Sequence, residues 1–353
     1  MTVRELVKSL LISLRGGWSP AGAVALAVLM VIGMFGLGVL HVYLKSRGIV
    51  LIPTVEGAIH VRVGPAETMR ARGIAIRAEG VERLRDVFAE LGYDVAGLDG
   101  DRVLVPRLFV AALPKDLKSV RPAKERKKLF IQAVLPQVLL INELIAASRQ
   151  RLLSLKGDIE AGSLGRRDRA WLAALRERYR VDGDDVDELV RRVDAVPVPL
   201  ALAQAAIESG WGTSRFAREG NAIFGQWTWA QRGGLVPKQR DEGAKHSIRA
   251  FRQIADSISA YVRNLNTHTA YARFRNVRAA IRRVGCRLDS ITLSTTLDRY
   301  SQRGAAYVDD IRGIMRRNRL ARFADATLMT RTCRMADARA PTPRVMLVRV
   351  PRC

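Results

Sequence analysis

The chain has 353 residues, of which 48% are hydrophobic, and its 59 Lys and Arg against 34 Asp and Glu give a formal net charge of +25. The length allows about two to three domains, and the apolar fraction excludes a disordered chain. Three cysteines are too few for a disulfide-rich scaffold. The cysteines and the four histidines show no metal-ligand spacing, so we expect no metal and no cofactor. The basic charge indicates a polyanionic partner: nucleic acid, anionic lipid or cell-wall polymer.

Residues 21–44 form an almost wholly apolar run without Asp, Glu, Lys or Arg. About 20 such residues span a bilayer, so the run predicts a single transmembrane helix rather than a cleaved signal peptide, whose apolar region is roughly 7–15 residues long. Arg4, Lys8 and Arg15 precede it. The positive-inside rule therefore predicts that residues 1–20 are cytoplasmic and that the rest lies on the periplasmic, or extracytoplasmic, side of the inner membrane.

Residues 48–110 show short alternating runs at 59–63 and 103–105 around a helical pattern at 79–91. This pattern predicts a small α/β spacer or docking segment. The basic stretch at 115–128 has no interleaved aromatic residues, which favours a solvated loop and first helical turn over a nucleic-acid surface.

Helical patterns then follow at 129–153, 167–179 and 185–193. Pro136 lies inside the first of them and predicts a kink or a break into two helices. Val196-Pro197-Val198-Pro199 separates this helical region, residues 111–194, from the segment that follows.

The segment 195–320 is basic and contains only nine carboxylates. Asp256 and Asp289 precede helical patterns and are interpreted as N-caps, and most of the others as turn residues or solvated ion pairs. Three carboxylates remain as candidates for acid–base chemistry, namely Glu208, Asp241 and Glu242.

Glu208 ends an apolar helical run at 200–207 and is followed by Gly210 and Gly212, which stop a helix. The negative end of the helix dipole and an apolar surrounding both disfavour the charged form of a carboxylate, so a raised pKa is predicted. A raised pKa suits a general acid near neutral pH. The alternative is a half-exposed glutamate that hydrogen-bonds the following turn.

The run at 202–214 (LAQAAIESGWGTS) resembles the signature of bacterial peptidoglycan N-acetylglucosaminidases of glycoside hydrolase family 73. The motif NAIFGQW at 221–227 is similar to that family's groove-lining segment, and 251–261 and 300–307 resemble its later aromatic motifs. The order and spacing of the four motifs agree over 195–320. The segment at 264–271 and, more weakly, residues 125–130 with Asn142 and Glu143 indicate the Bax-like branch.

The resemblance implies an α+β, predominantly α-helical fold: a lysozyme-like catalytic domain at 195–320 with a small β-hairpin lobe between Gly233 and Ala250. The helical region 111–194 would be its Bax-like part. Residues 321–353 are basic and contain three prolines, and this composition predicts a loosely ordered C-terminal tail. Cys286 and Cys333 are candidates for a disulfide, which would leave Cys353 free.

The resemblance assigns the general acid to Glu208 and places a second acid on the β-lobe, for which Glu242 is favoured over Asp241. The substrate's own N-acetyl group could replace the second carboxylate. Arg215 and Arg218 are either contacts for stem-peptide carboxylates or ordinary surface charges. The expected substrate-binding residues are Asn221, Phe224, Gly225, Gln226, Trp227, Tyr261, Tyr300 and Tyr307, of which Tyr261 is expected mainly to pack and Tyr300 to face the cleft.

The implied function is a membrane-anchored peptidoglycan hydrolase that cleaves the β-1,4 bond after N-acetylglucosamine. Its partners would be glycan strands and the inner membrane, and not nucleic acid; the oligomeric state is open. The alternatives are a muramidase or a lytic transglycosylase of the same fold, and a non-catalytic peptidoglycan-binding or scaffolding protein. A membrane-tethered nucleic-acid binder has only the charge in its favour.

Overall fold

The computed structural model describes most of the chain from Gly57 onward. The chain divides into two compact units, Met1–Val55 and Glu56–Cys353, and every described residue belongs to the second unit. The transmembrane run expected at 21–44 therefore lies outside the described residues. The described ranges are 57–62, 68–98, 103–228, 234–235 and 247–330.

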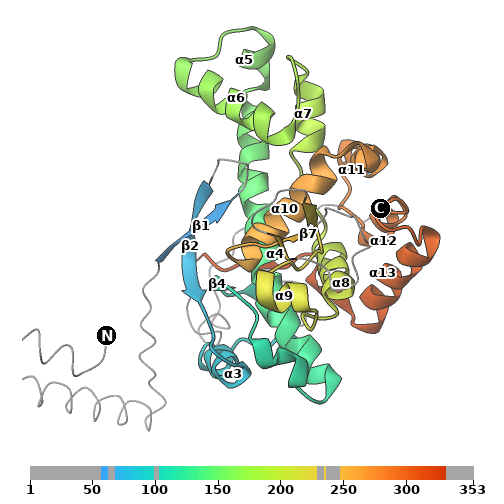
Figure 1. The fold of residues 1–353 in the computed structure, drawn as a ribbon. Helices are drawn as coiled ribbons and strands as arrows, with labels where there is room; N and C mark the ends of the chain where they lie inside the picture. Colours follow the sequence, from blue (N-terminus) through green and yellow to red (C-terminus); the bar gives the residue numbers. More distant parts are fainter. Residues whose placement is uncertain (1–56, 63–67, 99–102, 229–233, 236–246, 331–353) are drawn as a thin grey trace, which may run out of the picture. The chain divides into compact units, whose positions relative to one another are not determined.

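One long helix, α4 (Ala123–Ser154), runs through the middle of the described unit (Figure 1). Every residue from Leu129 to Ile141 is buried. A helix that is apolar all round belongs in a core or a membrane, and among the described residues α4 is the one helix that has the length and composition of a membrane span. Because most of that stretch is buried inside the fold, we interpret α4 as the core helix.

The break into two helices that was one of the two outcomes predicted at Pro136 is wrong, because α4 continues through this proline as one helix. Proline removes one backbone donor. The side-chain amide of the buried Gln137 donates to the carbonyl oxygens of Ala133 (3.0 Å) and Val110 (2.9 Å). These hydrogen bonds, with packing on all sides, hold the turn in place.

The first described segment forms a small sheet that packs against the helical body (Figure 1). β1 (Gly57–Arg62) pairs antiparallel with β2 (Thr68–Ile76), whose end pairs parallel with β4 (Leu108–Val110). Helix α3 (Val81–Glu90) lies between β2 and β4 in the chain. The first strand and the helix that the sequence predicts here are confirmed.

Polar contacts fasten this sheet to the helices. The guanidinium of Arg107 donates to both carboxylate oxygens of Glu143 on α4 (2.9 and 3.0 Å). The backbone N–H of Arg62 donates to the carboxylate of Asp256 (2.9 Å). Asp256 lies in the first turn of α10 (Ile254–Thr267), so the sequence-based prediction that it is the N-cap of this helix is wrong. The helix begins at Ile254, three residues earlier than the sequence predicted, so Asp256 is available to bind the sheet.

The strand predicted at 103–105 is β3 (Leu104–Val105), and it pairs parallel with β8 (Thr327–Leu328). The start of the predicted C-terminal tail is therefore ordered and belongs to the fold. Short 3₁₀ turns complete this part of the described chain at Val95–Gly97, Lys115–Ser119, Thr269–Tyr271 and Leu320–Phe323.

Beyond the end of α4, three helices form a lobe (Figure 1). Asp185 accepts a hydrogen bond from the N–H of Glu188 (2.8 Å) and caps the last of them. The two helices predicted at 167–179 and 185–193 are confirmed. The three are α5 (Lys156–Glu160), α6 (Arg166–Tyr179) and α7 (Val186–Arg192).

The C-terminal half is built around α8 (Val198–Ser209), which packs against α4 and against α13 (Ala305–Arg317). A small antiparallel sheet in the order β5-β7-β6 lies beside these helices. This mostly helical arrangement with a small sheet is consistent with the expected lysozyme-like α+β domain. The remaining elements are α9 (Arg215–Gly220), α11 (Ala272–Arg283), α12 (Ser290–Ser294), β5 (Trp227–Thr228), β6 (Gly234–Leu235) and β7 (Ser247–Arg249).

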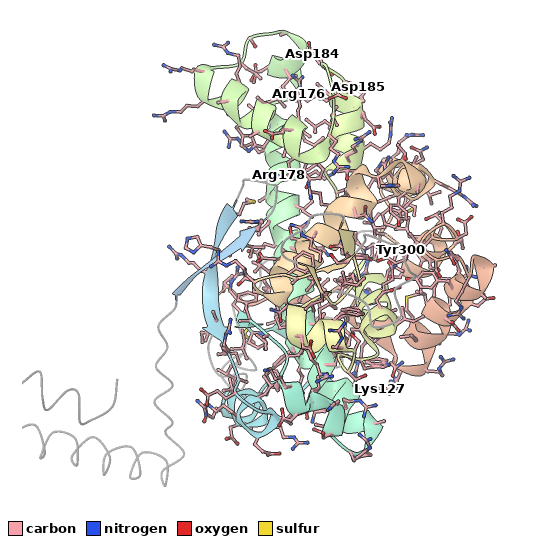
Figure 2. The ribbon with its side chains drawn as sticks, viewed as in Figure 1. Lys127, Arg176, Arg178, Asp184, Asp185 and Tyr300 are labelled. Carbon is pink, nitrogen blue, oxygen red and sulfur yellow. The ribbon has the colours of Figure 1, made fainter. Side chains whose placement is uncertain are left out.

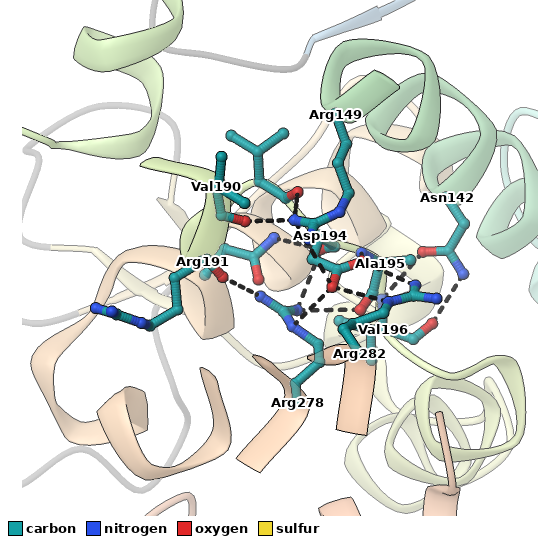
Figure 3. Close-up of polar contacts among 11 residues, drawn as sticks. Asn142, Arg149, Val190, Arg191, Asp194, Ala195, Val196, Arg278 and Arg282 are labelled. Carbon is teal, nitrogen blue, oxygen red and sulfur yellow. Dashed lines mark hydrogen bonds and ion pairs between the residues drawn. The ribbon is translucent and has the colours of Figure 1, made fainter. Parts of the chain in front are cut away.

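Asp194, three residues before Pro197, is buried among arginines (Figure 3). Arg282 donates to both of its carboxylate oxygens (3.1 and 2.9 Å), and Arg278 Nε and Arg149 Nη1 lie 3.7 and 3.9 Å from Oδ2. Burial alone would raise the pKa of Asp194, but the charge of Arg278 and the contacts of Arg282 outweigh it and hold the pKa below its usual value.

The same cluster fixes the main chain that leads into α8. Arg278, which is fully buried, donates to the carbonyl oxygens of Arg191 (3.0 Å) and Ala195 (3.0 Å). Asn142 on α4 accepts from the N–H of Val196 (3.2 Å) and donates to its carbonyl (2.8 Å). The start of α8 is therefore held from α4 and α11 together.

We predict that Asp194→Asn lowers the free energy of unfolding by about 3–5 kcal/mol, because the buried Arg278 loses its counter-charge. The measurement is denaturant unfolding, with Asp309→Asn, an exposed position on α13, as a control that changes it by less than about 0.5 kcal/mol. The lowered pKa means that the contribution of Asp194 is present above the unfolded pKa of 3.8 and is lost as the pH falls through the folded pKa. Equal stability of variant and wild type at neutral pH would contradict the prediction.

Candidate active site

Helix α8 places Glu208 at the end of a buried rod of small and apolar side chains. The residues from Val198 to Ala206 are all buried. Alanines at four of these positions let the neighbouring helices approach closely. The carboxylate of Glu208 leaves this core half-buried, at the last turn of the helix, as the sequence predicts.

A tight turn follows Glu208 at once. Gly210, Trp211 and Gly212 have φ angles of 58°, 59° and 76°, a run of left-handed backbone that favours glycine. The N–H of Trp211 donates to the carbonyl of Ala206 (2.8 Å) and closes the helix end. A side-chain carbon on Gly212 would lie 2.6 Å from Leu113, so the turn also needs glycine for space.

A chain of three hydrogen bonds runs through the core to Glu208. Tyr261 Oη donates to Gln204 Oε1 (2.6 Å), Gln204 Nε2 donates to Tyr307 Oη (3.0 Å), and Tyr307 Oη donates to Glu208 Oε1 (2.7 Å). Gln204 lies one helical turn before Glu208, so both side chains leave α8 on one face. Each hydroxyl or amide proton in the chain points toward the carboxylate.

Burial raises the pKa of Glu208, and the hydrogen bond from Tyr307 opposes that shift because it stabilises the charged form. The direction agrees with the sequence-based expectation. The same environment raises the pKa of Tyr307, through burial first and the charge of Glu208 second, so this tyrosine stays protonated and remains a donor.

Aromatic rings form a layer around this hydrogen-bonded chain. Tyr300 stacks on Tyr307 with 5.4 Å between ring centroids, and Phe224 stacks on Tyr261 at 3.8 Å. Tyr271 joins the layer with its ring 5.8 Å from that of Tyr300, which is labelled in Figure 2.

The expected substrate-binding residues divide according to their burial. Phe224, Tyr261 and Tyr307 are buried, so their described contacts are with other rings and with the hydrogen-bonded chain. Tyr300 keeps some exposure. The expected packing role of Tyr261 agrees with its complete burial.

The NAIF motif brings main chain, rather than side chains, next to Glu208. Asn221 is in left-handed backbone (φ 51°), and its amide donates to the carbonyl oxygens of Phe251 (3.1 Å) and Arg252 (3.2 Å). A side-chain carbon on Gly225 would lie 4.0 Å from Glu208 Oε2, so Gly225 lies beside that oxygen, and its left-handed backbone (φ 58°) favours glycine.

The remaining expected site residues lie partly outside the described structure. Gln226 is half-exposed and lines a pocket. Trp227 begins β5, but its side chain is outside the described part, as are Glu242 and Asp241. Among the described residues, no group of three or more His, Cys, Asp or Glu is placed to hold a metal ion.

The sequence analysis missed Gln204 and Tyr271. Gln204 had a readable signal: it is the one polar side chain in the run from 198 to 207, and it precedes Glu208 by four residues. Tyr271 ends the segment at 264–271 that indicated the Bax-like branch, but nothing in the sequence showed its place in the aromatic layer, which depends on how α10 and α11 are joined.

The site lies in a part of the chain that is similar to known proteins. Residues 183–320 match the Glucosaminidase family model, which is described as mannosyl-glycoprotein endo-beta-N-acetylglucosaminidase. The chain is 34% identical to the protein named Protein bax of Escherichia coli (strain K12) over 203 residues, which cover 56% of this chain and 71% of that protein. The chain belongs to the glucosaminidase-domain family, in its Bax-like branch. No solved structure gives a significant match.

We predict that Tyr307→Phe raises the pKa of Glu208 further, because the variant loses the hydroxyl that stabilises the carboxylate. The measurement is a carbon-13 titration of labelled glutamate. Tyr300→Phe is the matched control, since Tyr300 stacks on the same ring without donating to Glu208 in the described contacts. A pKa that falls in Tyr307→Phe would show that the hydrogen bond does not favour the charged form.

Proposed function

We propose that the protein is a peptidoglycan hydrolase that cleaves the β-1,4 glycosidic bond after N-acetylglucosamine, with Glu208 as general acid. The observation that carries this proposal is a half-buried carboxylate with a raised pKa at the end of a buried helix, within the segment that matches the glucosaminidase family. Membership of that family supports a glycan strand of peptidoglycan as the substrate.

The hydrogen-bonded chain determines which oxygen of Glu208 acts. Because Oε1 accepts the proton of Tyr307, the acidic proton of Glu208 belongs on Oε2. That oxygen lies next to Gly225 of the family's groove-lining motif. In the proposed reaction Oε2 protonates the leaving glycosidic oxygen as an oxocarbenium-like centre develops on the sugar. Activity is then lost as the pH rises through the raised pKa of Glu208.

The second carboxylate of the proposal is Glu242, with Asp241 as the alternative. Either would activate water or stabilise the positive charge that develops on the sugar. If the substrate's N-acetyl group does this instead, Glu208 is the indispensable carboxylate. Variants of Glu242 and Asp241 therefore belong in the same experiment.

The test is to incubate the purified full chain with peptidoglycan and to identify the new reducing ends by mass spectrometry. We expect ends at N-acetylglucosamine, and a loss of at least about 10²-fold in kcat for Glu208→Gln. Glu219→Gln, on the exposed side of α9, is the matched control and keeps activity within about twofold.

Other products would redirect the proposal. Ends at N-acetylmuramic acid identify a muramidase, and an anhydro-muramyl end identifies a lytic transglycosylase. Binding without cleavage at every pH identifies a binding or scaffolding protein. Loss of activity in Glu242→Gln or in Asp241→Asn identifies the second carboxylate, whereas full activity in both favours the N-acetyl group.

We also propose that residues 21–44 anchor the protein in the inner membrane, with the catalytic domain on the periplasmic side. The uncharged apolar run supports the anchor. Cys286 takes part in a disulfide, which is typical of proteins outside the cytoplasm.

We expect alkaline phosphatase fused after residue 353 to be active in cells, because that enzyme needs an oxidising compartment to form its disulfides. A β-galactosidase fusion at the same position should be inactive. Deletion of residues 21–44 should move the protein out of the membrane fraction. An active β-galactosidase fusion would place the domain in the cytoplasm.

A further inference from the structure

A pocket of about 400 Å³ opens beside the aromatic layer, and the charged side chains that line it are arginines. Arginines from three separate elements reach it: Arg180 at the end of α6, Arg249 at the end of β7 and Arg263 on α10. No Asp or Glu lines it.

None of these three arginines forms an ion pair with a carboxylate in the described part of the chain. Burial lowers the pKa of Arg263, and the charges of Arg180 and Arg249 lower it further. Burial also lowers the pKa of Arg249, as does Arg62, while Asp256 acts in the opposite direction. Positive charge that is partly desolvated and lacks a paired anion is costly, and a bound anion would relieve this cost.

At another place in the fold, the charge of a buried arginine is balanced by a carboxylate. Arg278 is more deeply buried than the pocket arginines, yet the carboxylate of Asp194 lies beside it and backbone carbonyls accept its protons. The pocket arginines differ from Arg278 in this respect, because no described carboxylate forms an ion pair with them.

The pocket adjoins the site around Glu208 on two sides. Tyr271 lines the pocket and belongs to the aromatic layer that surrounds Tyr307. Gln226 also lines it and directly follows Gly225, which lies next to Glu208 Oε2. Gln226 Oε1 itself is buried and has no hydrogen-bond partner among the described residues, so Gln226 borders the pocket without presenting this atom to it.

The other arginines considered for this role are engaged locally. Arg215 pairs with Glu219 one helical turn away (3.5 Å), and Arg218 Nε donates to the carbonyl of Thr213 (3.1 Å). They lie on α9 and do not line the pocket.

We propose that Arg180, Arg249 and Arg263 form a carboxylate-binding subsite that holds the stem peptide of a peptidoglycan strand beside Glu208. The stem peptide carries carboxylates, which the three arginines can pair with in a pocket that has no Asp or Glu in its lining. This inference rests on the proposed function and goes beyond it, because it assigns a preference for peptide-bearing glycan to named residues.

The experiment compares kcat/KM of the full chain on three substrates. These are peptide-bearing glycan strands, the same strands after an amidase has removed the peptides, and an uncharged N-acetylglucosamine oligomer. In the double variant Arg249→Gln/Arg263→Gln we expect the ratio of kcat/KM for peptide-bearing strands to that for the oligomer to fall about tenfold or more, because a charge-assisted hydrogen bond is lost.

Arg273→Gln, at an exposed position on α11 that does not line the pocket, removes one charge and serves as the control, with each single variant beside it. An equal fall on the peptide-free strands would assign the subsite to the lactyl carboxylate of the sugar instead of the peptide. A ratio in the double variant within twofold of the wild type would overturn the proposal. Circular dichroism and thermal unfolding confirm that each variant is folded.

Failure of the proposed function would give a different result from failure of the subsite. If the wild type cleaves none of the three substrates, the hydrolase proposal fails. Calorimetry with a free stem peptide then tests the subsite by itself. Weaker binding to the double variant than to the wild type supports it, and equal binding, or none to the wild type, rejects it.

Discussion

The buried contact between Asp194 and Arg278 is the constraint on which the site depends. Arg278 also donates to the carbonyl oxygens of Asp194 and Ala195, which lead into α8, and α8 carries Glu208 at its other end. A helix is stiff along its axis, so fixing its first turn and packing its sides fixes the position of the last side chain. An ion pair of this kind adds little to stability by itself, because desolvation offsets the attraction. We interpret the role of this ion pair as positioning the main chain at the start of α8.

Sequence patterns were most informative where structure is local. The helix over 200–208, the glycine turn after it and the direction of the pKa shift of Glu208 follow from neighbours in the chain, and the structure has all three. The four family motifs also predicted the domain, because their order and spacing along the chain match those of the family.

Long-range contacts were not predictable in this way. Where α4 passes through Pro136, the neighbouring Gln137 donates to Val110, which lies 27 residues earlier. The sheet contact of Asp256 with Arg62 joins residues 194 positions apart. The three pocket arginines come from α6, β7 and α10, and no pattern in their separate neighbourhoods shows that they meet.

The pairing of β3 with β8 has a consequence for the size of the folding unit. The family match ends at residue 320, whereas β8 lies at Thr327–Leu328 and its partner strand lies at Leu104–Val105. A fragment cut at the limits of the match would keep the catalytic motifs but lose α4, and with it the apolar surface that covers α8. The segment that is recognisable by homology is therefore smaller than the segment that can bury its own core, and an expression fragment has to be chosen by the second boundary.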